Sequence, residues 1–186
     1  MFSRQQIPNL LTFARVAAVP VCLLLMLAAP AWNAALLWIF IAAALTDFLD
    51  GYLARRWQAV SPLGALLDPV ADKLLVALML LYLLWDAAAA SPAALFPPVV
   101  VILLRELYIA GLREFLANRQ ISLPVSRGGK WKTALQMLAI ALLLARGAYG
   151  DLPPWTELGL PLLYASALLA LTSAASYSRA SLKHLR

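Results

Sequence analysis

The chain has 186 residues, 63% of them hydrophobic, with a net charge of +6 and a mean hydropathy of +0.82. Soluble globular domains are about 45–50% apolar, so this composition excludes an ordinary soluble domain and predicts an integral membrane protein. The single histidine, His184, and the single cysteine, Cys22, exclude a histidine-based metal site and an intrachain disulfide.

The apolar runs predict an all-α protein with six transmembrane helices around a polar cavity, in a single domain, 1–186. The helices are expected near residues 9–29, 33–56, 63–86, 93–117, 131–148 and 155–177, with a short interfacial segment at 1–8 and a basic tail at 178–186. The stretch after Arg15 is similar to a signal peptide, but the helix-compatible residues before it favour a first helix that is retained.

Lysine and arginine gather at one set of helix ends, whereas the connections at the opposite ends contain only Arg146. The positive-inside rule places the basic ends, and with them both termini and the cavity, on the cytoplasmic side. The positive charge then suits anionic lipid headgroups of that leaflet, and we expect no nucleic-acid partner.

The first predicted helix carries three polar residues, Asn9, Thr12 and Arg15, at three-residue steps that place them on one face. We expect this face to close the cavity. Ordinary hydrogen bonding between helices explains the pattern nearly as well.

The second and third predicted helices carry four aspartates. Asp47 and Asp50 are three residues apart, and Asp68 and Asp72 are four apart, so each pair lies on one helical face. Both pairs lie at a similar depth from the connecting loop, so antiparallel neighbours would bring four carboxylates together just inside the membrane. Such a cluster costs on the order of 10 kcal/mol to insert.

Two interpretations of the aspartates are open. They can pair with basic residues such as Arg55, Lys73 or Arg105. We favour binding of one or two Mg²⁺ or Mn²⁺ ions, because four oxygen ligands without histidine or cysteine suit hard divalent cations that also bind phosphate.

Small residues flank the aspartates. Gly51, Ala54 and Gly64 leave space for a ligand, although each alone also fits helix packing. Arg55 lies one turn beyond Gly51, where a guanidinium can hold a phosphate with two hydrogen bonds.

The fourth and fifth predicted helices bring basic residues to their cytoplasmic ends. These residues suit a phosphorylated acceptor, and Glu106 and Glu114 can orient a neighbouring guanidinium. The alternative is an ordinary positive-inside cluster, which is weakest for Arg105 because it lies inside an apolar span. The residues are Arg105, Arg113, Lys130 and Lys132.

The aspartates and their neighbours form the pattern Asp-x2-Asp-Gly-x2-Ala-Arg-x8-Gly-x3-Asp-x3-Asp, from Asp47 to Asp72. This pattern resembles the signature of the CDP-alcohol phosphatidyltransferases, at every fixed position. The resemblance implies homodimeric membrane enzymes with six transmembrane helices that displace CMP from a CDP-linked lipid. It also implies that the four aspartates hold two metal ions, that Asp72 is the general base, and that Gly51, Arg55 and Gly64 line the nucleotide site.

Further stretches resemble the bacterial branch of the family that forms phosphatidylglycerophosphate: "IPNLLTFARV", "LGALLDPVADK", "LLRELYIAGLRE" and "SRGGKWKTALQM". The implied reaction joins CDP-diacylglycerol and sn-glycerol 3-phosphate in the bacterial cytoplasmic membrane. The expected CDP-diacylglycerol site comprises Gly51, Ala54, Arg55, Gly64, Asn9 and Thr12. The expected glycerol-phosphate site comprises Arg105, Arg113, Lys130 and Ser126.

We expect direct attack by the acceptor hydroxyl, with Asp72 taking its proton, because no histidine, cysteine or activated serine lies near. The rival interpretations are a family member with another acceptor (inositol phosphate, serine or phosphatidylglycerol), a cation transporter, and a non-catalytic assembly protein. A transporter is disfavoured because the acids lie at the membrane edge and no repeat is visible.

Overall fold

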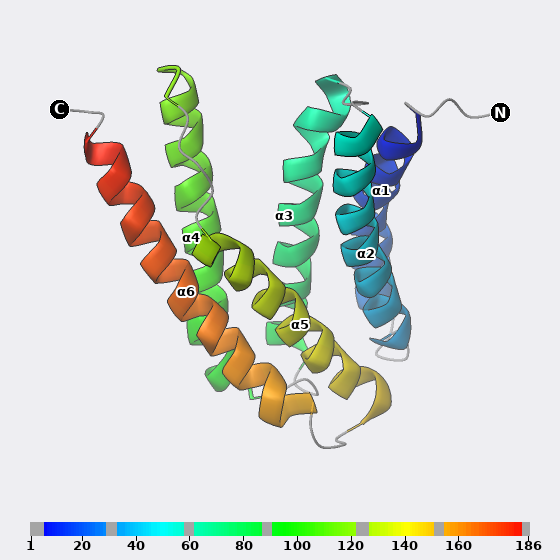
Figure 1. Cartoon of the computed structure of the whole chain (residues 1–186). Helices are drawn as coiled ribbons and strands as arrows, with labels where there is room; N and C mark the ends of the chain where they lie inside the picture. Colours follow the sequence, from blue (N-terminus) through cyan, green and yellow to red (C-terminus); the bar gives the residue numbers. More distant parts are fainter. Residues whose placement is uncertain are drawn as a thin grey trace.

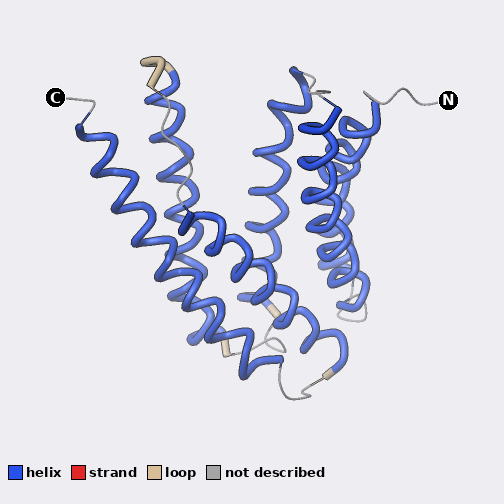
Figure 2. The backbone as a smooth tube through the Cα atoms, viewed as in Figure 1, coloured by secondary structure: helices blue, strands red, loops and turns tan. Residues whose placement is uncertain are grey.

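The computed structural model describes residues 6–28, 33–57, 62–86, 91–121, 127–150 and 155–183. Within these ranges the side chains of residues 6–9, 48–57, 62–66, 68–69, 127–130 and 183 are not described. Every regular element in the described ranges is a helix, and none is a strand (Figure 2). The all-α prediction is therefore confirmed. The helices are α1 (Gln6–Ala28), α2 (Asn33–Trp57), α3 (Pro62–Trp85), α4 (Pro92–Ala117), α5 (Arg127–Tyr149) and α6 (Trp155–Lys183).

Three helix ends differ from the predicted ones. The first helix begins at Gln6, inside the expected interfacial segment, and the fifth begins at Arg127 rather than near 131. The sixth continues to Lys183, so residues 178–183 are helical rather than a tail.

Contacts of its last turns explain the longer α6. The hydroxyl groups of Ser178 and Tyr108 of α4 lie 2.8 Å apart, and Ser181 donates a hydrogen bond of 2.8 Å to the carbonyl oxygen of Tyr177. Ser181 is only 2% exposed. Residues 178–183, part of the expected basic tail, therefore extend a packed helix.

The helices form two groups of three (Figure 1). In one group α1 packs against α2 and α3, and in the other α6 packs against α4 and α5. Contacts of α2 with α5, and of α3 with α4 and α5, join the groups. The described ends of the chain, the start of α1 and the end of α6, lie at the same end of the bundle, where α3 and α4 are far apart (Figure 1).

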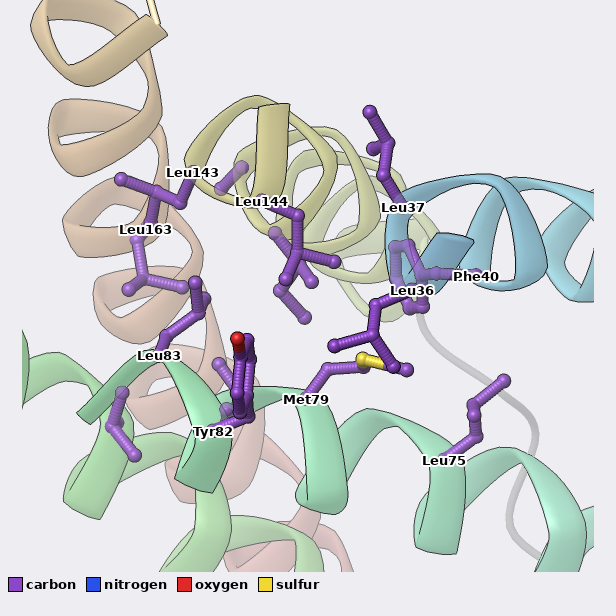
Figure 3. Close-up of a cluster of buried hydrophobic side chains, with 14 of the residues drawn as sticks. Leu36, Leu37, Phe40, Leu75, Met79, Tyr82, Leu83, Leu143, Leu144 and Leu163 are labelled. Carbon is purple, nitrogen blue, oxygen red and sulfur yellow. The ribbon is translucent and has the colours of Figure 1, made fainter. Parts of the chain in front are cut away.

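The apolar core lies in the half of the bundle farther from the chain ends and draws on all six helices. Leu36 of α2 points toward Met79 of α3 there, and Leu83, Leu143 and Leu163 of α3, α5 and α6 lie in the same cluster (Figure 3). Lipid tails are as apolar as these side chains, so close packing rather than removal from water holds the two groups together inside the bundle.

On α1, α2, α3 and α5 the inward face changes from apolar to polar toward the described chain ends. On α2 the buried positions Phe40 and Ala43 follow three- and four-residue steps, and the next step reaches Asp47. On α3 one step back from the buried Leu75 reaches Asp72. Both carboxylates therefore belong to the inward faces of their helices.

The same change occurs on α1 and α5. Thr12 and Arg15 are each 2% exposed and share the inward face of α1 with the buried Cys22. Lys132 and Gln136, each 4% exposed, begin the buried face of α5. A polar interior thus occupies the half of the bundle nearer the chain ends.

At the opposite end a smaller group of hydrogen bonds joins α2, α3 and α5. Asn33 donates to Asp86 Oδ2 at 3.2 Å and to the carbonyl oxygen of Gly147 at 3.0 Å, and it accepts a hydrogen bond from Tyr82. We call these four residues the outer polar cluster.

Three segments of the described residues are long and apolar enough to cross a membrane, namely Leu10–Ala28, Pro92–Ala117 and Trp155–Leu182. Asn33–Asp47 is a shorter apolar stretch. The interior charges on α2, α3 and α5 reduce the apolar character of these helices.

Candidate active site

One buried guanidinium joins three helices. Arg15 of α1 is 2% exposed, and its Nη1 atom lies 2.6 Å from Asp47 Oδ1 of α2 and 2.6 Å from Asp72 Oδ1 of α3. Hydrogen bonds link both pairs. The alternative interpretation, ion pairing of the aspartates, thus applies to these two carboxylates. Their partner among the described side chains is Arg15, whereas Arg55, one of the basic residues that we considered, lies outside the described side chains.

The prediction that four carboxylates meet concerns two further residues. Asp50 and Asp68 lie in α2 and α3, one helical turn from Asp47 and Asp72, but their side chains lie outside the described residues. Among the residues that are described, no three histidine, cysteine or acidic side chains come together. The structure therefore describes half of the predicted cluster.

A cavity of about 500 Å³ opens beside these carboxylates, between α2, α3, α4 and α5. Asp47 and Asp72 line one side of it, and Glu106, Arg113 and Lys132 line the other. The wall between them is mostly apolar. It contains Leu74, Val76, Ala77, Leu80, Ile102, Leu103, Leu107, Ala110 and Met137, with Lys73, Thr133 and Gln136 as further polar residues.

The second charged cluster is built on Glu106. Its Oε1 atom accepts a hydrogen bond from Arg105 Nη1 at 3.0 Å and another from Lys132 of α5. Arg105 also donates through Nη2 to Ser173 Oγ of α6 at 2.9 Å. The side chains of Lys132 and Arg105 are 5% and 11% exposed. Two nearly buried cations therefore share one carboxylate.

The structure separates the basic residues that we expected to bind the acceptor. Arg113 lines the cavity, and its guanidinium carbon lies 5.5 Å from the centre of the Tyr177 ring of α6, within the range of a cation–π contact. Arg105 is not among the cavity-lining residues that are described and instead points to Glu106 and Ser173.

Most of the other predicted site residues lie outside the described side chains. Thr12 is described and buried, one turn from Arg15. The expected substrate-site residues whose side chains are not described are Asn9, Gly51, Ala54, Arg55, Gly64, Ser126 and Lys130.

Three residues make contacts in the site that the sequence did not predict. Arg15 was expected to line the cavity, and its contact with both carboxylates was missed. Lys132 was left between an acceptor-binding residue and an ordinary positive-inside residue. Glu106 was expected to orient a neighbouring guanidinium, which its bond with Arg105 confirms, but its second bond, with Lys132, was missed. The burial of Lys132 had a signal, since Lys132, Gln136 and Ile140 follow four-residue steps into the core of α5.

The donors between α2 and α3 fit a hard divalent cation. Asp47 and Asp72 each present one carboxylate oxygen to a single positively charged atom. A set of oxygen donors without sulfur or imidazole suits Mg²⁺ or Mn²⁺. Their side chains are 40% and 35% exposed, which leaves them accessible from the cavity.

Comparison with known proteins places this site in a family. The family model of CDP-alcohol phosphatidyltransferases matches residues 5–175. The chain belongs to the CDP-alcohol phosphatidyltransferase family. The resemblance in the sequence is confirmed, and the chain is a multi-pass membrane transferase of phospholipid biosynthesis.

Two bacterial relatives are similar over nearly their whole length. The chain is 37% identical over 181 residues to the CDP-diacylglycerol–glycerol-3-phosphate 3-phosphatidyltransferase of Rickettsia bellii, covering 97% of both chains. It is 41% identical over 188 residues to the protein of the same name from Pseudomonas fluorescens, covering 97% of this chain and 92% of the relative.

A plant relative carries a different name. The chain is 42% identical over 186 residues to the cardiolipin synthase (CMP-forming) of Oryza sativa, which covers 93% of this chain and 56% of that protein. Family membership therefore does not by itself identify the acceptor alcohol.

Proposed function

We propose that this CDP-alcohol phosphatidyltransferase transfers the phosphatidyl group of CDP-diacylglycerol to sn-glycerol 3-phosphate, which yields phosphatidylglycerophosphate and CMP. The observation that carries the proposal is the charge arrangement of the cavity. On one side two carboxylates share one guanidinium, and on the other two cations share one carboxylate. One side therefore attracts cations and the other attracts an anionic acceptor.

The carboxylate side is the proposed metal and nucleotide site. Asp47, Asp50, Asp68 and Asp72 would hold two Mg²⁺ or Mn²⁺ ions, which supply neutralisation of the pyrophosphate charge when bound. Gly51, Ala54, Arg55, Gly64, Asn9 and Thr12 would surround the CDP group. Support comes from the inward orientation of Asp47, Asp72 and Thr12.

Asp72 is the proposed general base. It belongs to the carboxylate pair and also lines the cavity, so its carboxylate can meet a hydroxyl group that enters there. The hydroxyl oxygen at position 1 of glycerol 3-phosphate attacks the phosphorus that carries the diacylglycerol. The bond from this phosphorus to the CMP oxygen breaks, and Asp72 takes the hydroxyl proton.

The basic side is the proposed acceptor site. Arg113 and the nearly buried Lys132 line the cavity there, and a phosphate dianion would pair with them through charge-assisted hydrogen bonds. Lys130 and Ser126 precede Lys132 in the chain and remain part of the proposal. Arg105 would act by holding Glu106, and through it Lys132, in place.

The proposed setting is the bacterial cytoplasmic membrane, with all six helices crossing it and residues 1–186 forming one domain. The start of α1 and the end of α6 lie at one end of the bundle, which supports an even number of spans (Figure 1). The excess of lysine and arginine at that end supports a cytoplasmic location for the site and both termini. We also propose that the protein is a homodimer, as the family resemblance implies.

A second acceptor is supported by the plant relative. A cardiolipin synthase uses a lipid as its acceptor, and the apolar wall of the cavity would accept one. We favour glycerol 3-phosphate because the two near-full-length bacterial relatives carry that activity in their names and because a small dianion makes better use of Arg113 and Lys132.

The test is an assay of CMP release with identification of the lipid product. The purified chain in lipid nanodiscs receives CDP-diacylglycerol, Mn²⁺ or Mg²⁺, and one acceptor at a time: glycerol 3-phosphate, glycerol, inositol phosphate, serine or phosphatidylglycerol. We expect phosphatidylglycerophosphate as the main product and no CMP release in excess EDTA. Cardiolipin formation from phosphatidylglycerol would favour the second candidate, and equal use of glycerol would refute the phosphate site.

A further inference from the structure

Arg15 is in an unusual position for an arginine between two acids. A guanidinium commonly pairs with one carboxylate through two parallel hydrogen bonds. Here its Nη1 atom contacts one oxygen from each of two carboxylates on two different helices. A bridging metal ion makes a similar arrangement, with a positively charged group between oxygen donors from both carboxylates.

We propose that Arg15 is a built-in counter-ion that competes with the divalent cation for Asp47 and Asp72. This inference rests on the proposed metal site. Arg15 joins the two helices when no cation is bound, and cation binding displaces Nη1 from at least one of the two oxygens.

Two physical arguments support competition rather than joint binding. The two Oδ1 atoms converge on Arg15 Nη1, so a cation that bridges them at that point takes the place of the nitrogen. A cation bound to the remaining oxygens would lie within a few ångströms of the guanidinium charge. Like charges repel strongly at that distance in the low-dielectric interior.

The geometry also explains how exchange can occur. Arg15 approaches from α1 and is 2% exposed, whereas the two carboxylates are 40% and 35% exposed and line the cavity. A cation therefore arrives from the cavity while the guanidinium withdraws toward α1. Without Arg15, the two facing carboxylates would repel each other whenever the cation leaves.

The rival view is that Arg15 stays in place and orients the carboxylates for the metal. The two views predict opposite signs for one measurement. If Arg15 competes, its removal strengthens cation binding, because no ion pair has to be broken. If Arg15 orients the ligands, its removal weakens cation binding.

The experiment measures Mn²⁺ affinity of the full chain in nanodiscs by calorimetry, without substrates. We expect Arg15→Gln to bind Mn²⁺ about 10- to 150-fold more tightly than wild type, the range set by one charge-assisted hydrogen bond. Arg15→Lys keeps the charge and should remain near wild type. Lys73→Gln is the matched control, since it removes an exposed positive charge next to Asp72 without touching the shared contact. Equal or weaker binding by Arg15→Gln, or a gain no larger than that of Lys73→Gln, would overturn the proposal.

A second measurement follows the wild-type protein, with Arg15→Lys used for assignment, and covers the case in which Arg15→Gln does not fold. In a chain with ¹⁵N-labelled arginine, the Arg15 guanidinium signal is assigned by its loss in Arg15→Lys. We expect its protons to be protected from exchange in EDTA and to lose that protection at saturating Mg²⁺. Protection that persists unchanged in Mg²⁺ would refute displacement.

The outcomes separate this inference from the proposed function. If wild type binds Mn²⁺ and requires it for CMP release, but Arg15→Gln binds no more tightly, only the inference is wrong. If wild type neither binds Mn²⁺ nor requires it, the metal site itself is wrong and the inference is refuted with it.

Discussion

Replacement of Glu106 by glutamine tests whether one carboxylate holds the basic side of the cavity together. Glu106 accepts hydrogen bonds from Arg105 and Lys132, and Arg105 continues to Ser173, so three helices, α4, α5 and α6, meet at this point. Glutamine keeps the shape and one acceptor oxygen but removes the charge. Two nearly buried cations then face each other without a counter-charge.

The expected effect follows from burial. Breaking a buried ion pair by removal of one partner costs about 3–5 kcal/mol, because the remaining charge is left unpaired. The Glu106 side chain is 25% exposed and borders the cavity, so water can partly solvate the cations. We therefore expect the lower end of the range, a loss of about 3 kcal/mol in the free energy of unfolding.

The assay is unfolding in mixed micelles by titration with sodium dodecyl sulfate, followed by circular dichroism. The double variant Glu106→Gln with Lys132→Met should recover most of the loss, because replacement of a buried pair by neutral groups is often nearly neutral. Glu114→Gln is the control, because Glu114 is an exposed acid two turns further along α4. It should change stability by less than about 0.5 kcal/mol. A Glu106→Gln protein as stable as this control, or no coupling between the two substitutions, would refute the reasoning.

Three further predictions concern the site and the packing. Asp72→Asn should lower kcat about 10²–10⁴-fold with a much smaller change in KM for CDP-diacylglycerol, and turnover close to wild type would exclude it as the base. Arg113→Ala should lower kcat/KM for glycerol 3-phosphate about 10- to 150-fold and spare CDP-diacylglycerol, whereas Arg55→Ala should do the reverse; identical profiles in steady-state assays would mean that the two sites are not separate. Gly147→Ala should destabilise by about 1–3 kcal/mol, because its Cβ would lie 3.0 Å from two atoms of the outer polar cluster. Gly111→Ala, with no atom within 4 Å, should stabilise by about 0.5–1 kcal/mol in the same unfolding assay.

The number of helices in the described ranges could be predicted from sequence because long apolar runs indicate membrane-crossing helices, whether their side chains face the core or the lipid. The helix ends were harder to predict where the local sequence is polar but tertiary contacts stabilise a longer helix. The fifth helix was expected to begin near residue 131, after a polar stretch, yet α5 begins at Arg127. At the end of α6, the contact between Tyr108 and Ser178 stabilises the additional helical turns. The two residues are 70 positions apart, so the local sequence around Ser178 does not predict this contact.

The inward orientation of the aspartates could also be predicted. Three- and four-residue spacing assigns a residue to a face, and the buried Phe40, Ala43 and Leu75 show that Asp47 and Asp72 share the faces that build the core. The spacing says nothing about which helix lies opposite. The role of Arg15 depends on α1 packing against both α2 and α3, which is a property of the tertiary arrangement.

The balance of interior charges is the feature that spacing alone could not supply. On the side of α1, α2 and α3, one cation faces two carboxylates, and on the side of α4 and α5 two cations face one carboxylate. The charges of the described ion pairs therefore sum to zero over both sides. The first side alone has an excess of negative charge, and the second has an excess of positive charge. An excess of negative charge destabilises the protein least where a mobile cation can bind and neutralise it. An excess of positive charge destabilises it least where an anionic substrate can do the same. A purely structural network would be expected to pair its charges within each cluster. The offset across a 500 Å³ cavity is what a site needs when it must bind a cation with one substrate and a phosphate with the other, and then release both.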